Sequence, residues 1–389
     1  MLEPTVLPGA RIGVLGGGQL GAMFAVAATR MGYLVEAFSD TADCPAARVC
    51  DRVHVVDFAD ETRLASIAGG LAAVTLEFEN IPAKAAAAVA AVTRLRPSPE
   101  VLFTTQDRGR EKAFLVAHGF PCARHAIIRR RGELPQAAAT VGFPSVLKTT
   151  AFGYDGKGQR KVGSAAELEA AFDDLGGQET VLEEWLEFDC ELSVVAARGQ
   201  DGAIAAFAPS RNEHANHILD VAVAPSGLAE PQVRGAREIA ERVLDALGVV
   251  GTACVEMFLA RDGRLLVNEI APRPHNSGHL TIDACETSQF EQQVRALCGL
   301  PLGSPRQVAP AAMVNLLGDC WERGEPDWAA ALGVPGVRLS LYGKSDPRPG
   351  RKMGHLTALA ATAEEAVERA VLARRVSSAG RASGPSSSC

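Results

Sequence analysis

Short apolar segments alternate with helix-like segments over the first hundred residues of the chain. Continuous apolar runs predict buried strands at residues 11–15, 33–38, 52–56 and 72–76. Amphipathic spacing predicts helices at 19–31 and 62–68, between these strands. Because parallel strands need crossover connections, this alternation predicts a parallel α/β sheet. The sequence Pro97-Ser98-Pro99 then predicts a domain boundary.

The pattern changes after residue 105, where strands and helices no longer alternate. A charged helix is predicted at 106–118 and a longer one at 230–247. Strands are predicted at 144–149, 180–185, 191–197, 218–223, 252–260 and 265–270. The last two strands are separated by Asp262-Gly263, a dipeptide typical of hairpin turns. This mixture predicts an α+β domain that is distinct from the first.

A smaller segment follows Pro301 and Pro305, with strands predicted at 311–317, 337–342 and 354–359. Ser, Gly and Ala dominate the last thirteen residues, for which we expect disorder. We therefore divide the chain into an N-terminal α/β domain (1–105), a central domain (106–305), a small C-terminal domain (306–376) and a tail (377–389).

Composition excludes several classes of protein. Of the 389 residues, 47% are apolar and 22% are charged, which is typical of a globular chain and excludes wholesale disorder. The 39 Lys and Arg against 46 Asp and Glu give a net charge of −7, so nucleic acid is not expected as a partner. No uncharged apolar run reaches the roughly 18 residues of a membrane span. Nine cysteines without a CxxC pair predict reduced thiols and a cytoplasmic location.

A glycine-rich loop, Gly16-Gly17-Gly18-Gln19-Leu20-Gly21, follows the first predicted strand and opens a helix. With Asp40 further along, it has the ingredients of a dinucleotide-binding motif, which alone indicates an NAD-dependent oxidoreductase. The amides of such a loop also bind the phosphate of other ligands. A third interpretation is that the glycines only allow close packing of helix and strand. The motif by itself does not decide among them.

A second glycine-rich loop is more specific. A predicted strand carries Lys148, and three glycines within residues 153–158 surround Lys157. Such a loop can close over ATP phosphates, with backbone amides as donors and the lysine neutralising charge. It does not fit the GxxxxGK[ST] pattern of a P-loop. A solvated hairpin is the alternative interpretation.

Glu256 and Glu269 lie on the two arms of the predicted hairpin. If they are opposite each other, their like charges need a cation, and Mg²⁺ with ATP phosphates is the natural one. Two solvated glutamates are the alternative. The segment that follows packs Arg273, two histidines, Asn276 and Ser277 into a dozen residues, which suits binding of a small oxyanion.

Together these motifs resemble the N5-carboxyaminoimidazole ribonucleotide synthetases, a family of the ATP-grasp superfamily. The matching strings lie at residues 16–21, 77–82, 106–108, 153–159, 268–279 and 351–355. The resemblance implies an ATP-grasp fold with an N-terminal Rossmann-like pre-ATP-grasp domain and a small C-terminal domain. It implies that ATP and bicarbonate carboxylate 5-aminoimidazole ribonucleotide (AIR) in purine biosynthesis, giving ADP and phosphate. It also implies a homodimer.

The same resemblance implies the site residues. Mg²⁺ would be bound by Glu256 and Glu269. ATP would contact Arg108, Lys148, Gly153, Tyr154, Asp155, Gly156, Lys157, Gly158, Gln159, Glu183, Glu184, Trp185, Leu186, Glu191, His214, Asn268 and Glu269. AIR would contact Gln19, Glu77, Tyr154, Asp155, Lys344, Arg351 and Lys352.

Catalytic roles are expected for four residues. Arg273 would grip bicarbonate through two donors, and His275 and Asp155 would handle protons. Lys157, with Lys148, would stabilise the transferring phosphoryl group. On this interpretation the first glycine loop is a substrate-phosphate loop, not a dinucleotide site.

Two positions depart from the family pattern: Ala271 stands where many ATP-grasp enzymes have a metal-binding Asn, and Ala151-Phe152 replaces more polar or glycine residues. Three alternatives to the leading hypothesis remain. One is another ATP-grasp enzyme, such as a formate-using transformylase or a biotin carboxylase. The others are a dinucleotide oxidoreductase and a non-catalytic nucleotide sensor. The presence of Glu256, Glu269 and Arg273 argues against the sensor.

Overall fold

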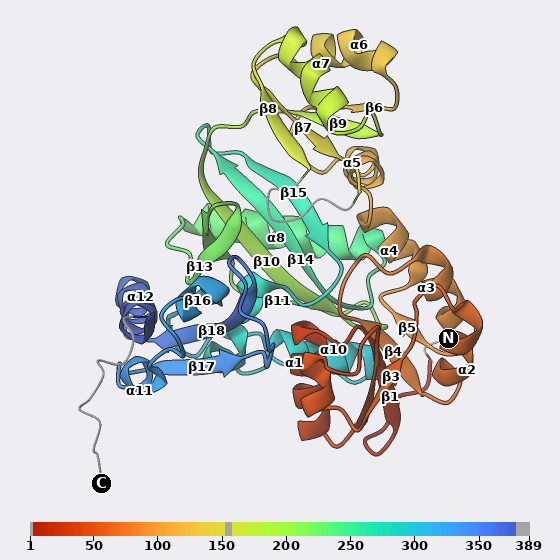
Figure 1. Ribbon diagram of the computed structural model, residues 1–389, viewed down its shortest axis with the longest axis vertical. Coiled ribbons are helices and arrows are strands. Elements are labelled where there is room, and N and C mark those ends of the chain that lie inside the picture. Colours follow the sequence, from red (N-terminus) through yellow and green to blue (C-terminus); the bar gives the residue numbers. More distant parts are fainter. Residues whose placement is uncertain (1–2, 152–157, 379–389) are drawn as a thin grey trace.

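The N-terminal domain contains a five-stranded parallel sheet with the strand order β3-β2-β1-β4-β5, as the alternation of segments predicts (Figure 1). The computed structural model describes residues 3–151 and 158–378. The strands are β1 (Arg11–Leu15), β2 (Leu34–Ser39), β3 (Arg52–Val55), β4 (Ala73–Leu76) and β5 (Leu95–Arg96). The helices are α1 (Gln19–Arg30), α2 (Glu61–Ala68) and α3 (Ala83–Ala90). Side chains of α1 pack on one face and those of α2 and α3 on the other, which explains why the central strands β1 and β4 are mostly apolar.

Two helices connect this domain to the rest of the chain, directly after the predicted boundary. They are α4 (Pro99–Thr105) and α5 (Arg108–Ala117). Ser98 caps α4, and Asp107 caps α5 by accepting from the Arg110 amide at 2.9 Å. These caps satisfy amides that lack a partner within the helix. The chain therefore enters the central part through a fixed helix.

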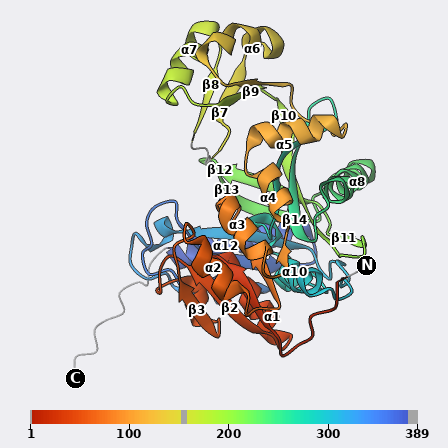
Figure 2. The same cartoon turned by 90° about the vertical axis from the view of Figure 1, so that its right-hand side faces the viewer.

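A four-stranded sheet with the order β6-β9-β7-β8 stands at one end of the molecule (Figures 1 and 2). Its strands are β6 (His125–Ile128), β7 (Ser145–Thr149), β8 (Gln159–Val162) and β9 (Thr180–Glu184). The helices α6 (Leu134–Val141) and α7 (Ala165–Asp174) pack against it and enclose an apolar cluster. The sequence predicts β7 and β9, whereas β6 and β8 are found only in the structure.

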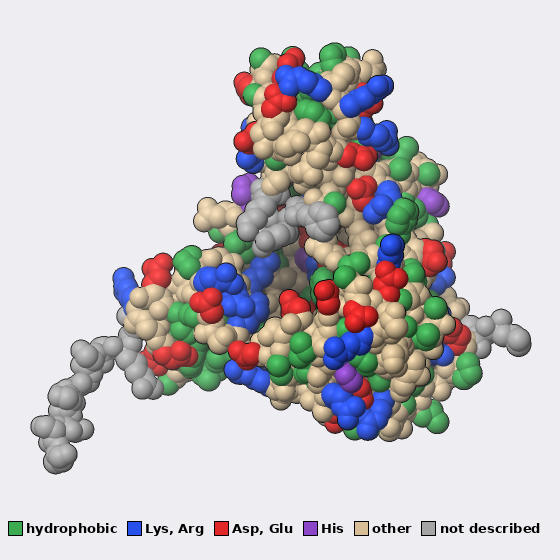
Figure 3. All heavy atoms as spheres, turned by 45° about the vertical axis from the view of Figure 1, so that its right-hand side comes forward, with side chains coloured by type: hydrophobic (Ala, Val, Ile, Leu, Met, Phe, Trp, Pro, Cys, Tyr) green, Lys and Arg blue, Asp and Glu red, His purple; other side chains and the backbone are tan. Residues whose placement is uncertain are grey.

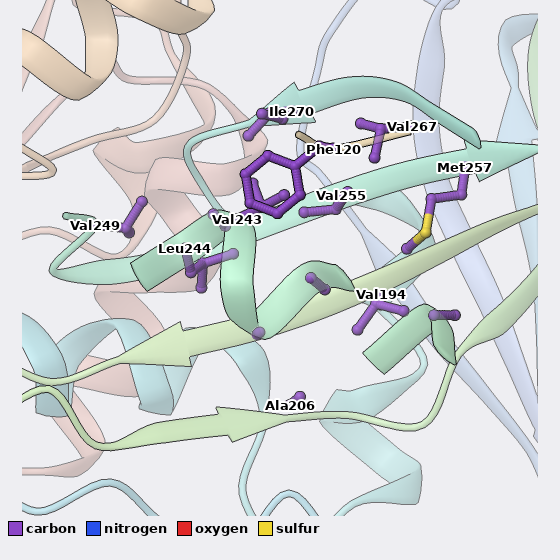
Figure 4. Close-up of a cluster of buried hydrophobic side chains, with 14 of the residues drawn as sticks. Phe120, Val194, Ala206, Val243, Leu244, Val249, Val255, Met257, Val267 and Ile270 are labelled. Atoms are coloured by element: carbon purple, nitrogen blue, oxygen red, sulfur yellow. The ribbon is translucent and has the colours of Figure 1, made fainter. Parts of the chain in front are cut away.

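The largest sheet has nine strands, in the order β15-β14-β10-β12-β13-β16-β18-β17 with β11 paired to β10. Its first six strands in sequence are β10 (Phe188–Arg198), β11 (Ile204–Ala206), β12 (Ser210–Ala215), β13 (Ile218–Ala224), β14 (Gly251–Ala260) and β15 (Leu265–Ala271). Helix α8 (Glu230–Leu247) packs on this sheet through Ala236, Ala240, Val243 and Leu244. Figure 4 shows Val243 and Leu244 among side chains of β10, β14 and β15. This core holds the predicted hairpin in place.

The C-terminal strands continue this sheet instead of forming one of their own. They are β16 (Ala311–Leu317), β17 (Val337–Leu341) and β18 (Lys352–Leu359), and β16 pairs with β13. The remaining helices include α9 (Thr281–Ala284), α10 (Gln289–Cys298), α11 (Trp328–Leu332) and α12 (Ala363–Ser378). The predicted disorder is wrong for residues 377 and 378, which belong to α12. Ser377 is buried in α12, and its carbonyl accepts from the Asp327 amide at 2.9 Å. Residues 379–389 lie outside the described residues.

Two expectations from composition can be compared with the structure. The eight cysteines within the described ranges are free thiols, as predicted; Cys389 lies outside these ranges. Within the described residues, no helix combines the length and the apolar character that crossing a membrane requires.

Candidate active site

The predicted site residues gather where the three sheets approach one another. β14 and β15 bring Glu256 and Glu269, and the small sheet brings Lys148. Lys352 begins β18, and Lys344 lies in the segment between β17 and β18. Figure 3 shows that the surface is hollowed beside the C-terminal strands, with Lys and Arg side chains gathered along one side of the hollow. The site is therefore assembled from segments far apart in the sequence.

Glu256 on β14 lies directly opposite Glu269 on β15, as the hairpin predicts. The register shifts beside this pair, because Met257 pairs with Val267 and Asn268 is the extra residue. Burial, and next the charge of Glu256, raise the pKa of Glu269. Two facing carboxylates fit a hard cation such as Mg²⁺. In the part of the chain that the structure describes, no group of three or more His, Cys, Asp or Glu side chains is arranged to hold a metal ion.

His275 is held at the same place by two hydrogen-bonding partners. Its Nε2 lies 2.8 Å from Glu256 Oε1, and its Nδ1 lies 2.8 Å from Ser277 Oγ. Burial alone would lower the pKa of His275, but the Cys254 thiol and the Glu256 carboxylate raise it to about 10. In return, His275 outweighs the effect of burial on Glu256 and lowers the pKa of that carboxyl group. The contact with Glu256 therefore favours the protonated form of His275, whereas the Ser277 amide, which lies 3.3 Å from Nδ1 as a donor, favours the neutral ring.

Arg273 does not present a free two-donor face to bicarbonate. Its Nε and Nη2 both donate to the carboxylate of Glu79, with 3.0 Å between Nη2 and Oε1. Its Nη1 donates to the Pro274 carbonyl at 3.2 Å. Burial would raise the pKa of Glu79, yet Arg273 lowers it to about 2, so this ion pair is fully charged. Glu79 thus accepts from that face of the guanidinium in this structure, and the two-point grip on bicarbonate stays a prediction.

Lys148 on β7 contacts Glu183 on β9, with 3.1 Å between Nζ and Oε2. A second lysine, Lys112 on α5, lies 3.7 Å from the same oxygen and donates to the Asn268 carbonyl at 3.0 Å. Burial would raise the pKa of Glu183, but Lys112 and Lys148 lower it to about 2. Lys112 is 1% exposed and links the small sheet to β15 behind the predicted ATP site.

Some of the other residues predicted to contact ATP already donate hydrogen bonds to main-chain carbonyls of this chain. Arg108 donates from Nη1 to the Thr149 carbonyl at 2.9 Å. The amides of Glu184 and Trp185 donate to the carbonyls of Arg124 and Pro144. These two main-chain amides bond within the small sheet, so they do not point free N–H groups at a ligand. Leu186 follows them at the end of β9.

Glu191 on β10 and His214 on β12 form an ion pair through Oε2 and Nδ1. Burial would lower the pKa of His214, but the hydrogen bond to Glu191 raises it overall. The structure therefore brings together two residues that the sequence assigns to ATP only through family resemblance.

The first glycine loop binds a carboxylate of this chain. The Gly18 amide donates to Glu77 Oε2 at 2.5 Å, and the Gly21 amide also bonds to Glu77. A Cβ at Gly18 would lie 2.0 Å from Glu77 Oε1, so only glycine fits there. Burial raises the pKa of Glu77 to about 7 against the effect of these amides. Glu77 therefore occupies these two amides, and the binding of a substrate phosphate by this loop stays a prediction.

The predicted substrate cations lie next to this loop. Lys344 Nζ donates to Gln19 Oε1 at 2.6 Å and to the Lys352 carbonyl at 2.7 Å. Burial, and next the charge of Arg351, lower the pKa of Lys344 to about 8. Arg351 donates to the Asp346 carbonyl at 2.8 Å. Three cations so close together favour binding of a multiply charged anion such as a phosphate.

Five residues of the second glycine-rich loop that were predicted to belong to the site fall in the gap between the two described ranges. Gly153, Tyr154, Asp155, Gly156 and Lys157 lie outside the described residues. Gly158, at φ +73°, accepts from the Thr149 amide at 2.9 Å, and Gln159 begins β8 opposite Lys148. The ends of the second glycine-rich loop are therefore beside Lys148, as a phosphate-covering loop requires.

Sequence reasoning missed Glu79, Glu111 and Lys112 as site residues. Glu111 is buried and accepts from the Ile270 amide at 2.8 Å, next to Glu269. Burial raises the pKa of Glu111 to about 8. The signal in the sequence is the adjacent pair Glu111 and Lys112, which are opposite charges within one predicted helix. Such pairs are common on solvated helices, so the pattern does not single out a site.

Family models match three consecutive parts of the chain. A ribonucleotide synthetase preATP-grasp domain matches residues 10–106, an ATP-grasp domain matches 113–290, and a phosphoribosylaminoimidazole carboxylase C-terminal domain matches 311–369. The fold and the carboxylate pair thus define an ATP-grasp enzyme.

Relatives narrow this class. N5-carboxyaminoimidazole ribonucleotide synthase of Bacillus subtilis is 42% identical over 357 residues, covering 92% of this chain and 93% of its own. An ADP complex of N5-carboxyaminoimidazole ribonucleotide synthetase superposes with a TM-score of 0.90 at 39% identity, covering 96% and 99% of the two chains. The Aspergillus clavatus enzyme with ADP and AIR gives 0.84 at 28% identity, covering 95% and 99%. The chain belongs to the N5-carboxyaminoimidazole ribonucleotide synthetase family of ligases. This assignment confirms the family resemblance. It excludes the two alternatives that the chain is a dinucleotide oxidoreductase or a member of another ATP-grasp family.

Proposed function

We propose that this chain uses ATP and bicarbonate to carboxylate AIR to N5-carboxyaminoimidazole ribonucleotide, releasing ADP and phosphate, in purine biosynthesis. One observation carries this proposal. Glu256 and Glu269 face each other on β14 and β15, and Glu256 is bonded to the imidazole of His275. A carboxylate pair for a metal nucleotide and a cation for a small anion are thus adjacent.

ATP would lie between the small sheet and β14–β15. Lys148 would neutralise its phosphates, while Glu183, paired with Lys112 and Lys148, fixes the position of that ammonium group. The Glu191–His214 pair lies on the large-sheet side. Mg²⁺ would be held by Glu256 and Glu269, and when bound it neutralises charge on the phosphates. These residues position ATP without covalent chemistry, as phosphoryl transfer requires.

Bicarbonate is a poor electrophile, so its oxygen first attacks the γ-phosphorus of ATP, and ADP leaves. The AIR amine then forms a C–N bond to the carboxyl carbon, the bond from that carbon to the phosphate oxygen breaks, and the departing phosphate takes up the proton that the amine loses. Protonated His275 would attract the anion and stabilise the leaving phosphate through its charge, while its two ring nitrogens stay bonded to Glu256 and Ser277. Arg273, held by Glu79, would add positive charge beside it.

The phosphate of AIR would bind to Lys344, Arg351 and Lys352, with Gln19 fixing Lys344. Glu77, held by the glycine loop, would accept hydrogen bonds from AIR hydroxyl groups instead of sharing the phosphate. Burial, and next the charge of Arg351, lower the pKa of Lys344, and the negative charge of a bound phosphate dianion would oppose this shift.

The direct test is ADP release with Mg-ATP and bicarbonate, with and without AIR. A large stimulation by AIR, with the carboxylated product found by mass spectrometry, is the expected result. ATP binding without stimulation would overturn the proposed acceptor. We also propose that the chain acts as a cytoplasmic homodimer, which rests on the family resemblance. Light scattering after size-exclusion chromatography tests the dimer, and cell fractionation tests the location.

A further inference from the structure

Gln289, on the first turn of α10, reaches back to the segment that carries the catalytic cation. Its Oε1 accepts from the His275 amide at 2.8 Å, and its Nε2 donates to the His275 carbonyl at 2.8 Å. One side-chain amide therefore holds both polar groups of a single main-chain residue. Gln289 is 0% exposed, so water does not compete for these bonds.

The same amide has a third partner. Its Nε2 lies 3.1 Å from Nδ1 of His279, which is also fully buried. An amide N–H can only donate to a main-chain carbonyl and an amide oxygen can only accept from a main-chain N–H, so His275 fixes which end of Gln289 is which. Nδ1 of His279 is therefore the acceptor. Both the amide and the neighbouring ring are fixed by the position of the His275 main chain.

The surrounding residues are shaped for this amide. A Cβ at Gly278 would lie 2.6 Å from Gln289 Oε1, so a side chain there would displace the amide oxygen. Thr281 Oγ1 accepts from the main-chain N–H of Gln289 at 3.0 Å and donates to the Gly278 carbonyl at 2.6 Å. The loop from His275 to Thr281 thus closes around Gln289 from both sides.

We infer that Gln289 is a positioning residue for the reaction: it holds the His275 main chain where the imidazole meets Glu256. The imidazole lies 2.8 Å from Glu256 Oε1, a distance that a small shift of the main chain would break. Misplacement of a reacting group by about 1 Å can cost roughly a hundredfold in rate. The inference rests on the proposed function, in which His275 attracts the anion.

The chain offers a matched control on the same helix. Gln292 is also 0% exposed, and its amide holds one residue in the same way. Its Nε2 donates to the Gly303 carbonyl at 2.6 Å, and its Oε1 accepts from the Gly303 amide at 2.9 Å. Gly303 follows α10 and is not among the site residues described above. The two glutamines therefore share burial and chemistry but differ in the segment they hold.

The test compares Gln289→Met with Gln292→Met, which keep side-chain volume and remove the amide. We expect kcat to fall at least about tenfold in Gln289→Met, with KM for ATP within about twofold of wild type. Gln292→Met should lose a similar amount of thermal stability but keep kcat within about twofold. Gly278→Ala, which displaces the amide without changing it, should reproduce the loss of kcat.

A second measurement does not depend on turnover. The imidazole ¹⁵N shifts of His275 at pH 7, assigned with a His275→Gln variant, should change in Gln289→Met and stay unchanged in Gln292→Met. Equal kcat in the two methionine variants, or unchanged His275 shifts in Gln289→Met, would overturn the inference. Failure of both Gln289→Met and Gly278→Ala to fold, with Gln292→Met folded, would also overturn it by showing a structural role. Failure of AIR to stimulate wild-type enzyme would instead contradict the proposed function, and the ¹⁵N shifts would still test the His275 contact.

Discussion

Arg273 and Glu79 form a two-point ion pair across 194 residues of sequence, joining the segment after β15 to the loop after β4. We expect Glu79→Gln to lower kcat/KM for bicarbonate at least about tenfold, because Arg273 loses its fixed orientation. The unfolding free energy should fall by about 2 kcal/mol, since a partly buried guanidinium loses its charged partner. Steady-state kinetics and urea unfolding measure the two effects. Full activity with wild-type stability would show that the pair has neither role.

Glu269→Gln should abolish turnover while preserving the fold. The amide removes repulsion with Glu256, so the thermal midpoint should stay the same or rise, whereas the pair can no longer neutralise Mg²⁺. We expect kcat to fall by more than about a hundredfold, measured as ADP release over a range of Mg²⁺ concentrations. Glu256→Gln is the comparison, because it also breaks the contact with His275 and should lower the midpoint. A fully active Glu269→Gln variant would refute the metal assignment.

Lys344 should produce an alkaline decline in AIR use. The Lys344 pKa of about 8 means that the ammonium form, which binds phosphate, is present below this pH and is lost above it. We therefore expect kcat/KM for AIR to fall about tenfold per pH unit above pH 8, because this ratio reports the free enzyme. Lys344→Arg stays charged and should lack the decline. A decline that persists in Lys344→Arg would assign it to another group.

Lys112→Met should weaken both the fold and ATP binding. It leaves Glu183 with Lys148 as its cationic partner and removes the bond to the Asn268 carbonyl. Removing one partner of a buried ion pair costs about 3 kcal/mol. We expect that loss in urea unfolding, together with a Kd for ADP at least about fivefold higher by calorimetry. An unchanged Kd for ADP would show that Lys112 stabilises the fold without positioning Lys148.

The parts of the fold that the sequence predicts are those with a local signal. β1 and β4 are mostly apolar runs, and the hairpin of β14 and β15 is marked by Asp262-Gly263. By contrast, β12 reads Ser-Arg-Asn-Glu-His-Ala and β8 reads Gln-Arg-Lys-Val, with few apolar residues. Their pairing with neighbouring strands makes them strands, which a local pattern cannot show.

The candidate site follows the same rule. Glu256 and Glu269 could be paired from the sequence because a short turn fixes their register. Glu77 lies 59 residues from the glycine amide that it accepts from, and the interpretation of that loop as a phosphate site could not include it. Arg273 was expected to have a free guanidinium for a similar reason. Family resemblance supplied the other residue roles, which spacing alone does not determine.

The pairing of β13 with β16 makes the C-terminal domain inseparable from the sheet that carries the carboxylate pair. A chain truncated before β16 would leave a row of unpaired amides and carbonyls along β13, the kind of edge that recruits other strands. The cations proposed to bind the substrate phosphate are also attached to this sheet, because β18, which begins with Lys352, pairs with β16. Exchanging this domain between enzymes to change the acceptor would therefore require re-engineering a strand interface as well as a binding site.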